Sequence, residues 1–238
     1  MNTSDEGVLE LSGVHGQPLS SLICQWHICD ACKIVDFGIE RIKHGYPCPH
    51  CGVPGQGGHM YFFSHHLTLV DLMQDLFHAR TPDGRDLEGN ERSLAGKHRF
   101  AVIIFFCTLW ETLLQNFLGE SMDMKPLSAD VQERILMQHQ SDRRRREVLF
   151  PLLAGVSWDA AIQQIDERFG RDHRPVIEFY AQVAKKRNAL LHRGHRFAVP
   201  RDMPRECIIH LRGCLQLFVD LHNTFIVEPL PESSPVPA

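Results

Sequence analysis

The sequence predicts a mainly α-helical protein with a small N-terminal module of short β-strands, and three observations lead to this fold class. Four cysteines in two close pairs stand in a glycine-containing segment with short β-rich runs, over residues 21–64. After this segment, apolar residues recur at helical spacing through most of the chain. Hydrophobic residues make up 43% of the 238 residues, which is enough to build a core.

The composition restricts the classes of function. The formal net charge is −4, so any basic surface for nucleic acid must be local. The N-terminal residues lack the charged start and apolar run of a secretory signal. The longest apolar-rich stretch, Phe100 to Trp110, is shorter than the ~20 residues that span a bilayer. We therefore expect a cytoplasmic protein without membrane contact, whose eight cysteines are ligands or core thiols and not disulfides.

The N-terminal module is expected to hold three short strands. Apolar and β-branched residues favour strands at residues 21–28, 34–37 and 60–63. The polar residues 1–20 before this module predict a flexible lead-in.

From residue 65 onward the sequence predicts helices separated by polar or proline-containing segments. A connecting helix over residues 67–77 is followed by a polar linker that ends at residue 96. Later helices are predicted at 97–118, 128–139, 142–153, from 157 past 165, at 175–194 and at 204–227. The predicted parts are a lead-in (1–20), the cysteine module (21–64), a connecting helix and linker (65–96), a helical bundle (97–228) and a disordered tail (229–238).

The spacing of the four cysteines predicts one structural zinc ion. Cys29 and Cys32 form the first pair, and Cys48 and Cys51 form the second. Two residues between the cysteines of a pair allow both thiolates to reach one ion from a tight turn. Four protein ligands leave no position for a reactive water, so a structural role is expected. The alternative is four unrelated buried thiols.

Further possible ligands stand close to this quartet. Any one of them could replace a cysteine, although each is more simply explained as a surface or packing residue: Cys24, His27, His44, His50 and His59.

The two pairs, CDAC and CPHC, resemble the knuckles of a zinc ribbon, over roughly residues 23–63. Zinc ribbons commonly contact nucleic acid or protein partners, so the resemblance implies such a partner without choosing between them. Basic residues in this module, Lys33, Arg41, Lys43 and His44, weakly favour nucleic acid.

The second informative segment is KKRNALLHRGHR, from Lys185 to Arg196. Gly194 stands where a helix-ending residue is expected, so His192 lies in the last helical turn. Asn188 is four residues earlier on the same face, whereas Arg187 points well round from that face. Arg187 and His192 would share one site if the facing surface belonged to a second copy of the chain.

Arginine and histidine without a metal suit the cleavage of RNA by its own 2′-hydroxyl. Histidine would move a proton, and arginine would stabilise the pentavalent phosphate. The alternative is that basic residues decorate a helix C-terminus because the helix dipole favours positive charge there. A run of four arginines, Arg143 to Arg146, is expected to form a solvated face, although it could also grip an RNA backbone.

Residues 97–227 resemble the HEPN family of all-helical domains, on two grounds. The first is the motif from Arg187 and Asn188 to His192, placed before the last long helix; the second is the apolar opening helix with the single acid Glu111 in its middle. This resemblance implies a homodimer whose motifs face one shared cleft and which acts as a metal-independent ribonuclease. It implies catalytic roles for Arg187 and His192, support from Asn188, and a further site role for Glu111.

The predicted function is therefore an endoribonuclease that leaves a 2′,3′-cyclic phosphate, with the cysteine module positioning substrate or partner. Because the family includes members without nuclease activity, the alternative is a non-catalytic module that binds nucleic acid or protein in a toxin–antitoxin or defence assembly. A third hypothesis is a zinc-ribbon scaffold protein, in which the helical domain serves only to form the dimer.

Overall fold

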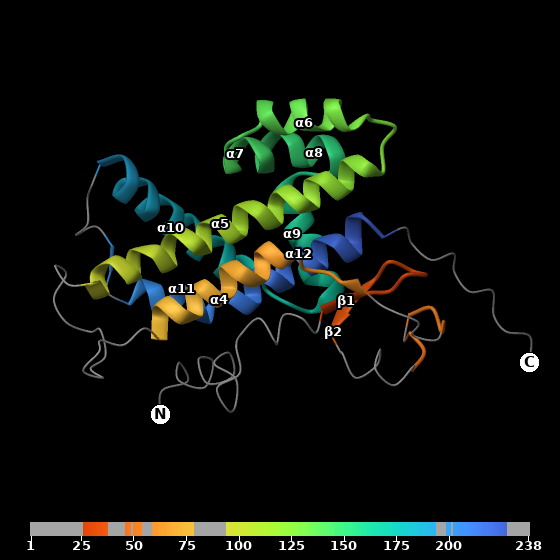
Figure 1. The fold of residues 1–238 in the computed structure, drawn as a ribbon. Helices are drawn as coiled ribbons and strands as arrows, with labels where there is room; N and C mark the ends of the chain where they lie inside the picture. Colours follow the sequence, from red (N-terminus) through yellow and green to blue (C-terminus); the bar gives the residue numbers. More distant parts are fainter. Residues whose placement is uncertain are drawn as a thin grey trace, which may run out of the picture. The chain divides into compact units, whose positions relative to one another are not determined.

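A computed structural model describes most of the chain (Figure 1). Helices make up 72% of the described residues and a small antiparallel sheet lies near the N-terminus, so the predicted fold class is confirmed. The predicted lead-in, most of the linker before residue 96 and the tail lie outside the described residues. The described residues are 26–37, 46–48, 50–53, 59–78, 94–193, 199–200 and 202–227.

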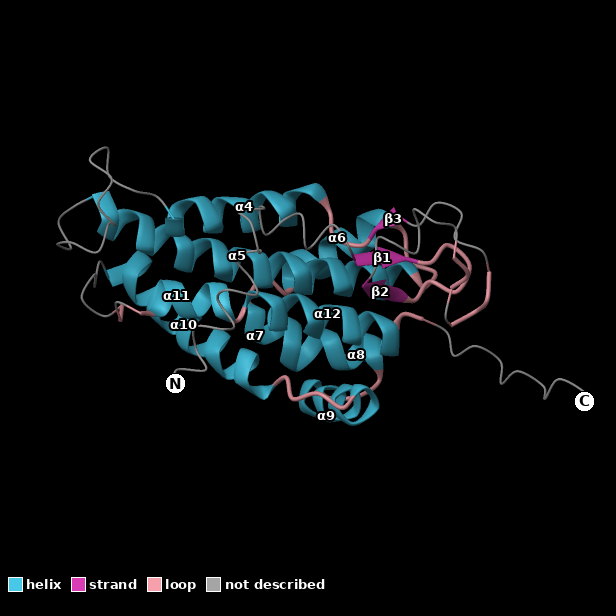
Figure 2. Cartoon of the chain, turned by 90° about the horizontal axis from the view of Figure 1, so that it is seen from below, coloured by secondary structure: helices cyan, strands magenta, loops and turns pink. Residues whose placement is uncertain are grey.

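The sheet has three short antiparallel strands in the order β2-β1-β3 (Figure 2). β1 (Trp26–Ile28) pairs with β2 (Val35–Phe37) on one side and with β3 (His59–Met60) on the other. Ile28 lies opposite Val35, so the first cysteine pair forms the turn between β1 and β2. Trp26 in β1 and Val35 in β2 are buried, so the sheet contributes apolar side chains to the core of its unit.

The chain divides into two compact units. Unit 1 contains the described parts of Phe62–Asn116 and Gly170–Phe218. Unit 2 contains the described parts of Cys24–Tyr61, Phe117–Phe169 and Val219–Ala238, so the cysteine module belongs to a unit that also includes helices.

Aromatic side chains form the core of unit 1. Trp110 stacks on Tyr180 with ring centroids 4.1 Å apart and meets the ring edge of Phe218 at 5.4 Å. These rings come from α5, α10 and α12, so one tryptophan joins three helices. The helices of this unit are α4 (Ser64–His78), the first part of α5 (Leu94–Asp123), α10 (Arg174–Arg193), α11 (Met203–Ile209) and the first part of α12 (Leu211–Phe225).

Two helices in the structure differ from the predicted ones: one is longer and the other is divided in two. α5 continues through Gly119 to Asp123, because Leu118 and Met122 on either side of that glycine are buried and packing outweighs its low helix propensity. The predicted helix at 204–227 is divided at His210, where ψ is −3°. The apolar stripe continues across this break, which is why the sequence pattern did not reveal it.

Phe150 lies at the centre of unit 2. Its ring contacts Trp158 at 5.1 Å, Phe117 at 5.6 Å and Phe225 at 5.9 Å between centroids. It therefore joins α8 to α9, α5 and α12. The helical elements of this unit are α6 (Ala129–Gln138), α7 (Asp142–Arg144), η1 (Arg145–Leu149), α8 (Phe150–Ala154), α9 (Trp158–Phe169) and the last parts of α5 and α12.

The predicted helix at 142–153 exists, but its middle turn, η1, is a π-helix. Pro151 follows this turn and has no N–H to donate to a carbonyl of the preceding turn, so the regular hydrogen-bond ladder cannot continue through it. The helix then ends at Gly155, whose φ of 77° lies in the left-handed region.

By length and composition alone, Phe100–Asp123 of α5 could cross a membrane. However, 56% of its most apolar window is buried inside the protein, as in the core helix that the sequence predicts.

Candidate functional site

The first cysteine pair forms a tight turn between β1 and β2. The Lys33 N–H donates to the Cys29 carbonyl at 2.8 Å, and the Cys29 N–H donates to the Ile34 carbonyl at 2.9 Å. Lys33 has a φ of 60°, which an L side chain rarely adopts. The turn therefore points both thiols to one side at the cost of some backbone strain.

The second pair repeats this geometry. The Gly52 N–H donates to the Cys48 carbonyl at 2.8 Å, and the Cys48 N–H donates to the Val53 carbonyl at 2.8 Å. Gly52 has a φ of 71° and occupies the position equivalent to Lys33. Both pairs thus form the same knuckle, with glycine meeting the left-handed requirement in only one of them.

The two knuckles bring the four thiols together. Cys29 Sγ lies 3.8 Å from Cys51 Sγ, and Cys32 Sγ lies 3.8 Å from Cys48 Sγ. These separations exclude disulfides, whose S–S bond is about 2.05 Å. They match the ~3.8 Å edge of a tetrahedron of thiolates with metal–sulfur bonds of about 2.3 Å. All four Sγ atoms lie within 4.8 Å of one another, so they can hold one metal ion.

The four thiols need a nearby cation if all of them are to ionise. Burial raises the pKa of the Cys32 thiol to about 12. Burial alone would also raise the pKa of Cys29, but hydrogen bonds from the backbone of Cys32 and Ala31 outweigh it and lower this pKa to about 7. Four adjacent thiols cannot all ionise without positive charge among them, and a bound metal ion supplies that charge.

No histidine joins this cluster in the described part of the chain. His50 and His59 instead lie near Asp36 and Asp30, at 4.0 and 3.7 Å, and His27 is buried in β1. Cys24 and His44, the other alternative ligands, lie outside the described residues.

Sequence reasoning missed the residues that hold the first knuckle from outside. His222 in α12 is buried, and its Nε2 lies 3.0 Å from the Lys33 carbonyl. Its Nδ1 lies 2.8 Å from Glu120 Oε2 on α5. The two ring nitrogens thus face a backbone carbonyl and a carboxylate, which are both hydrogen-bond acceptors.

Asn223, the next residue of α12, binds the same segment. The Val35 N–H donates to its Oδ1 at 2.8 Å, and its Nδ2 donates to the Val35 carbonyl at 2.8 Å. The side chain thus pairs with one β2 residue as a neighbouring strand would. The only hint in the sequence is a pair of polar residues at the end of an apolar helix.

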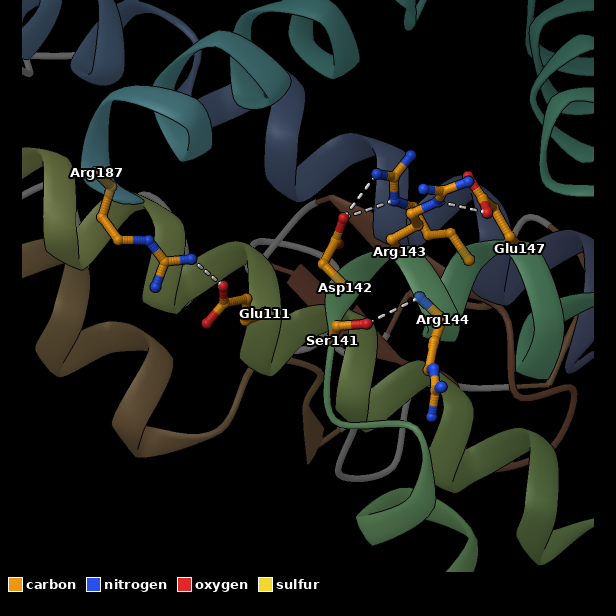
Figure 3. A network of polar contacts seen from close by, with 8 residues as sticks. Glu111, Ser141, Asp142, Arg143, Arg144, Glu147 and Arg187 are labelled. Atoms are coloured by element: carbon orange, nitrogen blue, oxygen red, sulfur yellow. Dashed lines mark hydrogen bonds and ion pairs between the residues drawn. The ribbon is translucent and has the colours of Figure 1, made fainter. Parts of the chain in front are cut away.

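In unit 1, two predicted site residues from separate helices meet. The Arg187 guanidinium on α10 donates through Nη2 to the Glu111 carboxylate on α5, as Figure 3 shows. Burial alone would lower the pKa of Arg187, but the hydrogen bond and the charge of Glu111 outweigh it and raise this pKa above its ordinary value. Arg187 is therefore held as a fixed cation. Among the described residues, its Nε is also buried without a hydrogen-bond partner.

Asn188 and His192 are exposed on α10. His192 makes no hydrogen bond or ion pair with Arg187 in the described structure. A single chain therefore brings Arg187 to Glu111 but does not bring it to His192.

The arginine run makes mostly local contacts. Arg143 pairs with Glu147 one turn away (Figure 3). Arg146 pairs with Asp142, also one turn away. Arg145 donates through Nε to the His139 carbonyl at 3.0 Å. These bonds explain much of the run as structural, although Arg143 keeps 81% of its side-chain surface exposed.

The remaining described cysteines, Cys107, Cys207 and Cys214, are fully buried in helices of unit 1, as core thiols are expected to be. Burial raises the pKa of Cys207 and of Cys214, so both stay protonated at neutral pH.

Comparison with known proteins does not identify the chain. No protein-family model, no curated protein and no solved structure matches it.

Proposed function

We propose that the four-cysteine site holds one structural Zn²⁺ ion per chain. Zinc prefers tetrahedral thiolate ligands, and the 3.8 Å sulfur separations suit its bond length. With all four positions taken by protein, the ion would join the two knuckles and would do no chemistry on a substrate.

Metal analysis of the purified protein tests this proposal. We expect about one zinc per chain, and less than half of that in a Cys48→Ser variant, because a missing thiolate opens the tetrahedron. Cys214→Ser, which changes a thiol outside the site, should keep its zinc. Equal zinc contents in wild type and Cys48→Ser would overturn the assignment.

We propose further that unit 1 carries the active site of a metal-independent endoribonuclease of the HEPN type, acting as a homodimer. The observation that supports this proposal most directly is the ion pair between Arg187 and Glu111. These residues lie 76 positions apart in the sequence, and the family resemblance names both, Arg187 from the motif and Glu111 from the apolar opening helix.

The roles follow from the chemistry of RNA cleavage. The 2′-oxygen attacks the adjacent phosphorus, the bond to the 5′-oxygen breaks, and a 2′,3′-cyclic phosphate and a 5′-hydroxyl remain. Two protons move, one from the 2′-hydroxyl and one to the leaving oxygen. His192 would transfer one of them, and a water molecule would transfer the other. Arg187, fixed by Glu111, would stabilise the charge on phosphorus.

The test uses a mixed pool of RNA in buffer without added divalent metal. We expect wild type to leave 2′,3′-cyclic phosphate ends. Arg187→Ala and His192→Ala should lower the rate at least 100-fold, since each removes one group that acts in the transition state. Glu111→Gln should lower it less, because the amide still accepts a hydrogen bond.

Lys185→Gln is the matched control, because Lys185 is an exposed cation on the same helix and outside the motif. It should cleave at nearly the wild-type rate. If wild type and all variants behave alike, the chain is not this enzyme, and RNA binding at low salt then distinguishes a non-catalytic binding module from a scaffold.

A further inference from the structure

The segment that closes the first knuckle is held on both of its sides. On one side, the turn bonds of Cys29 orient Cys29 and Cys32. On the other side, the backbone of Lys33 and Val35 is bound by His222 and Asn223 through three hydrogen bonds of 2.8 to 3.0 Å.

The side chains that make these three bonds are themselves fixed. His222 is 2% exposed, and Glu120 holds its second ring nitrogen. Its ring also meets the ring of Tyr61 at 4.9 Å between centroids. Asn223 is 8% exposed, and all of its bonds in the structure go to Val35.

We propose that His222 and Asn223, with Glu120 behind His222, are positioning residues of the metal site, which set its metal affinity from α12. This inference rests on the proposed metal site. It assigns to the end of α12 a role that the cysteine motif does not contain.

The physical reason is the direction of the thiols. Lys33 is strained at a φ of 60°, so the first knuckle would relax if its carbonyl were released. A relaxed knuckle would turn Cys29 and Cys32 away from Cys48 and Cys51, and each metal-binding event would first have to restore the geometry. When residues that orient the metal ligands by hydrogen bonds are substituted, metal affinity typically falls about 10- to 100-fold.

The coupling must act in both directions, because binding free energies are reciprocal. If α12 strengthens metal binding, the metal must in turn stabilise the last turn of α12 and its bonds to Lys33 and Val35. The metal would then be a cross-link between the sheet and a helix of the same unit, as well as between the two knuckles.

The experiment measures metal affinity by competition with a chromophoric chelator, using Zn²⁺ and the visible absorption of Co²⁺ thiolate complexes. His222→Phe keeps the ring and its contact with Tyr61 but loses both hydrogen bonds. Asn223→Leu keeps the side-chain volume but loses both bonds to Val35. We expect each to weaken metal binding about 10- to 100-fold. Glu120→Gln, which keeps an acceptor, should weaken it less.

Two control variants separate positioning from general damage. Thr224→Val, next to Asn223 in α12, removes a buried hydroxyl that has no hydrogen-bond partner among the described residues, so it should bind metal as wild type does. Ile165→Ala opens a cavity in α9 of the same unit and lowers stability without touching the knuckle, so its folded form should also keep wild-type affinity.

Hydrogen exchange supplies the second readout. In wild type, bound metal should slow the exchange of backbone amide hydrogens in a peptide that covers the last turn of α12. It should not slow exchange in a peptide from α10 of unit 1. In Asn223→Leu saturated with metal, this protection of α12 should be lost.

The two proposals fail differently. If the Cys48→Ser variant binds metal as tightly as wild type, the metal site itself is wrong. If wild type binds metal and the Cys48→Ser variant does not, but His222→Phe and Asn223→Leu bind as tightly as wild type, the positioning role of α12 is wrong.

Discussion

The His66 imidazole is nearly fully buried at the start of α4, where it takes part in a reciprocal cap. The Phe63 N–H donates to His66 Nδ1 at 3.3 Å, and the His66 N–H donates to the Phe63 carbonyl at 3.0 Å. Because Nδ1 accepts, a neutral ring carries its hydrogen on Nε2. Asn116 Nδ2 lies 3.2 Å from His66 Nε2, so the amide must turn over to place its oxygen, the acceptor, against that hydrogen. This one residue thus joins the start of α4 to α5 within unit 1.

This environment predicts a specific loss of stability in acid. Burial, with a smaller effect of the charge on His65, lowers the pKa of His66 to about 3. The unfolded chain takes up this proton near pH 6.5, so stability is complete above that pH and falls as the pH drops toward 3, by at most about 1.4 kcal/mol per pH unit. His66→Asn keeps an acceptor for the Phe63 N–H and removes the proton uptake.

Urea unfolding from pH 7 to pH 4.5 checks this prediction. The difference in free energy of unfolding between wild type and His66→Asn should shrink as the pH falls. The proposed metal site is the same in both proteins, so any loss of its stability in acid cancels from this difference. His65→Asn, at the exposed neighbouring position, should keep the slope of wild type. A pH-independent difference between wild type and His66→Asn would show that His66 does not titrate as its burial requires.

Substitutions at the two equivalent knuckle positions should differ in their effect on stability. Gly52 has a φ of 71° and no atom within 4 Å of where a Cβ would be, so Gly52→Ala pays only the backbone cost of about 1 kcal/mol. Lys33→Gly relieves the same kind of strain in the folded protein. Glycine also makes the unfolded chain more flexible, and this stabilisation of the unfolded state largely cancels the gain. Urea unfolding of the metal-saturated proteins should show a loss for Gly52→Ala and almost none for Lys33→Gly. Equal losses would mean that the two knuckles are not equivalent.

At the scale of elements, α6 differs from the other long helices because none of its residues is buried. It is held mainly at its ends. Near its start, Gln132 donates to Asp123 at 3.0 Å. At its other end, Arg144 and Arg145 donate to the carbonyls of Gln138 and His139. A ten-residue helix is marginal without packing, so α6 depends on these side-chain contacts.

We therefore expect α6 to open locally far more often than α9. Its amides should exchange with solvent at rates close to those of an unfolded peptide, whereas those of α9, which buries Ala161, Ile162 and Ile165, should approach the global limit. Met137→Lys in α6 should change the free energy of unfolding by less than about 0.5 kcal/mol, and Ile162→Ala in α9 should lower it by about 2–5 kcal/mol. Strong protection of α6 would show that something covers it in solution.

The elements also show what local sequence information can and cannot predict. The cysteine spacing predicted the knuckles, because a metal turn is a local pattern. The π-turn before Pro151 and the extension of α5 past Gly119 depend on packing, so residue preferences did not predict them. His222 and Asn223 bind residues 188 to 189 positions earlier in the chain, and no periodicity encodes such a contact.

At the scale of the whole molecule, the two candidate sites lie in different units. The cysteine cluster belongs to unit 2, and Arg187 and Glu111 belong to unit 1. Sequence reasoning named the residues of both candidate sites, but it could not predict the Arg187–Glu111 pair as a contact. Five residues along a helix turn His192 well round from Arg187, so the proposed reaction needs a second chain.

A mixing experiment tests whether the proposed active site is shared between chains. In a two-fold dimer, a site formed by Arg187 of one chain and His192 of the other can be rebuilt from two inactive variants. When Arg187→Ala and His192→Ala chains are unfolded, combined equally and refolded, about half of the dimers contain one chain of each kind, and one of their two sites is intact. We expect about one quarter of the wild-type cleavage rate per chain. If each site used Arg187 and His192 of a single chain, no intact site would form and the mixture would stay inactive.

Glu111 adds a second arm to this test, because it pairs with Arg187 of its own chain. A chain carrying both Glu111→Gln and Arg187→Ala should rescue His192→Ala as fully as Arg187→Ala does. A chain carrying both Glu111→Gln and His192→Ala should rescue Arg187→Ala less well, because the only intact site would then use an arginine without its carboxylate.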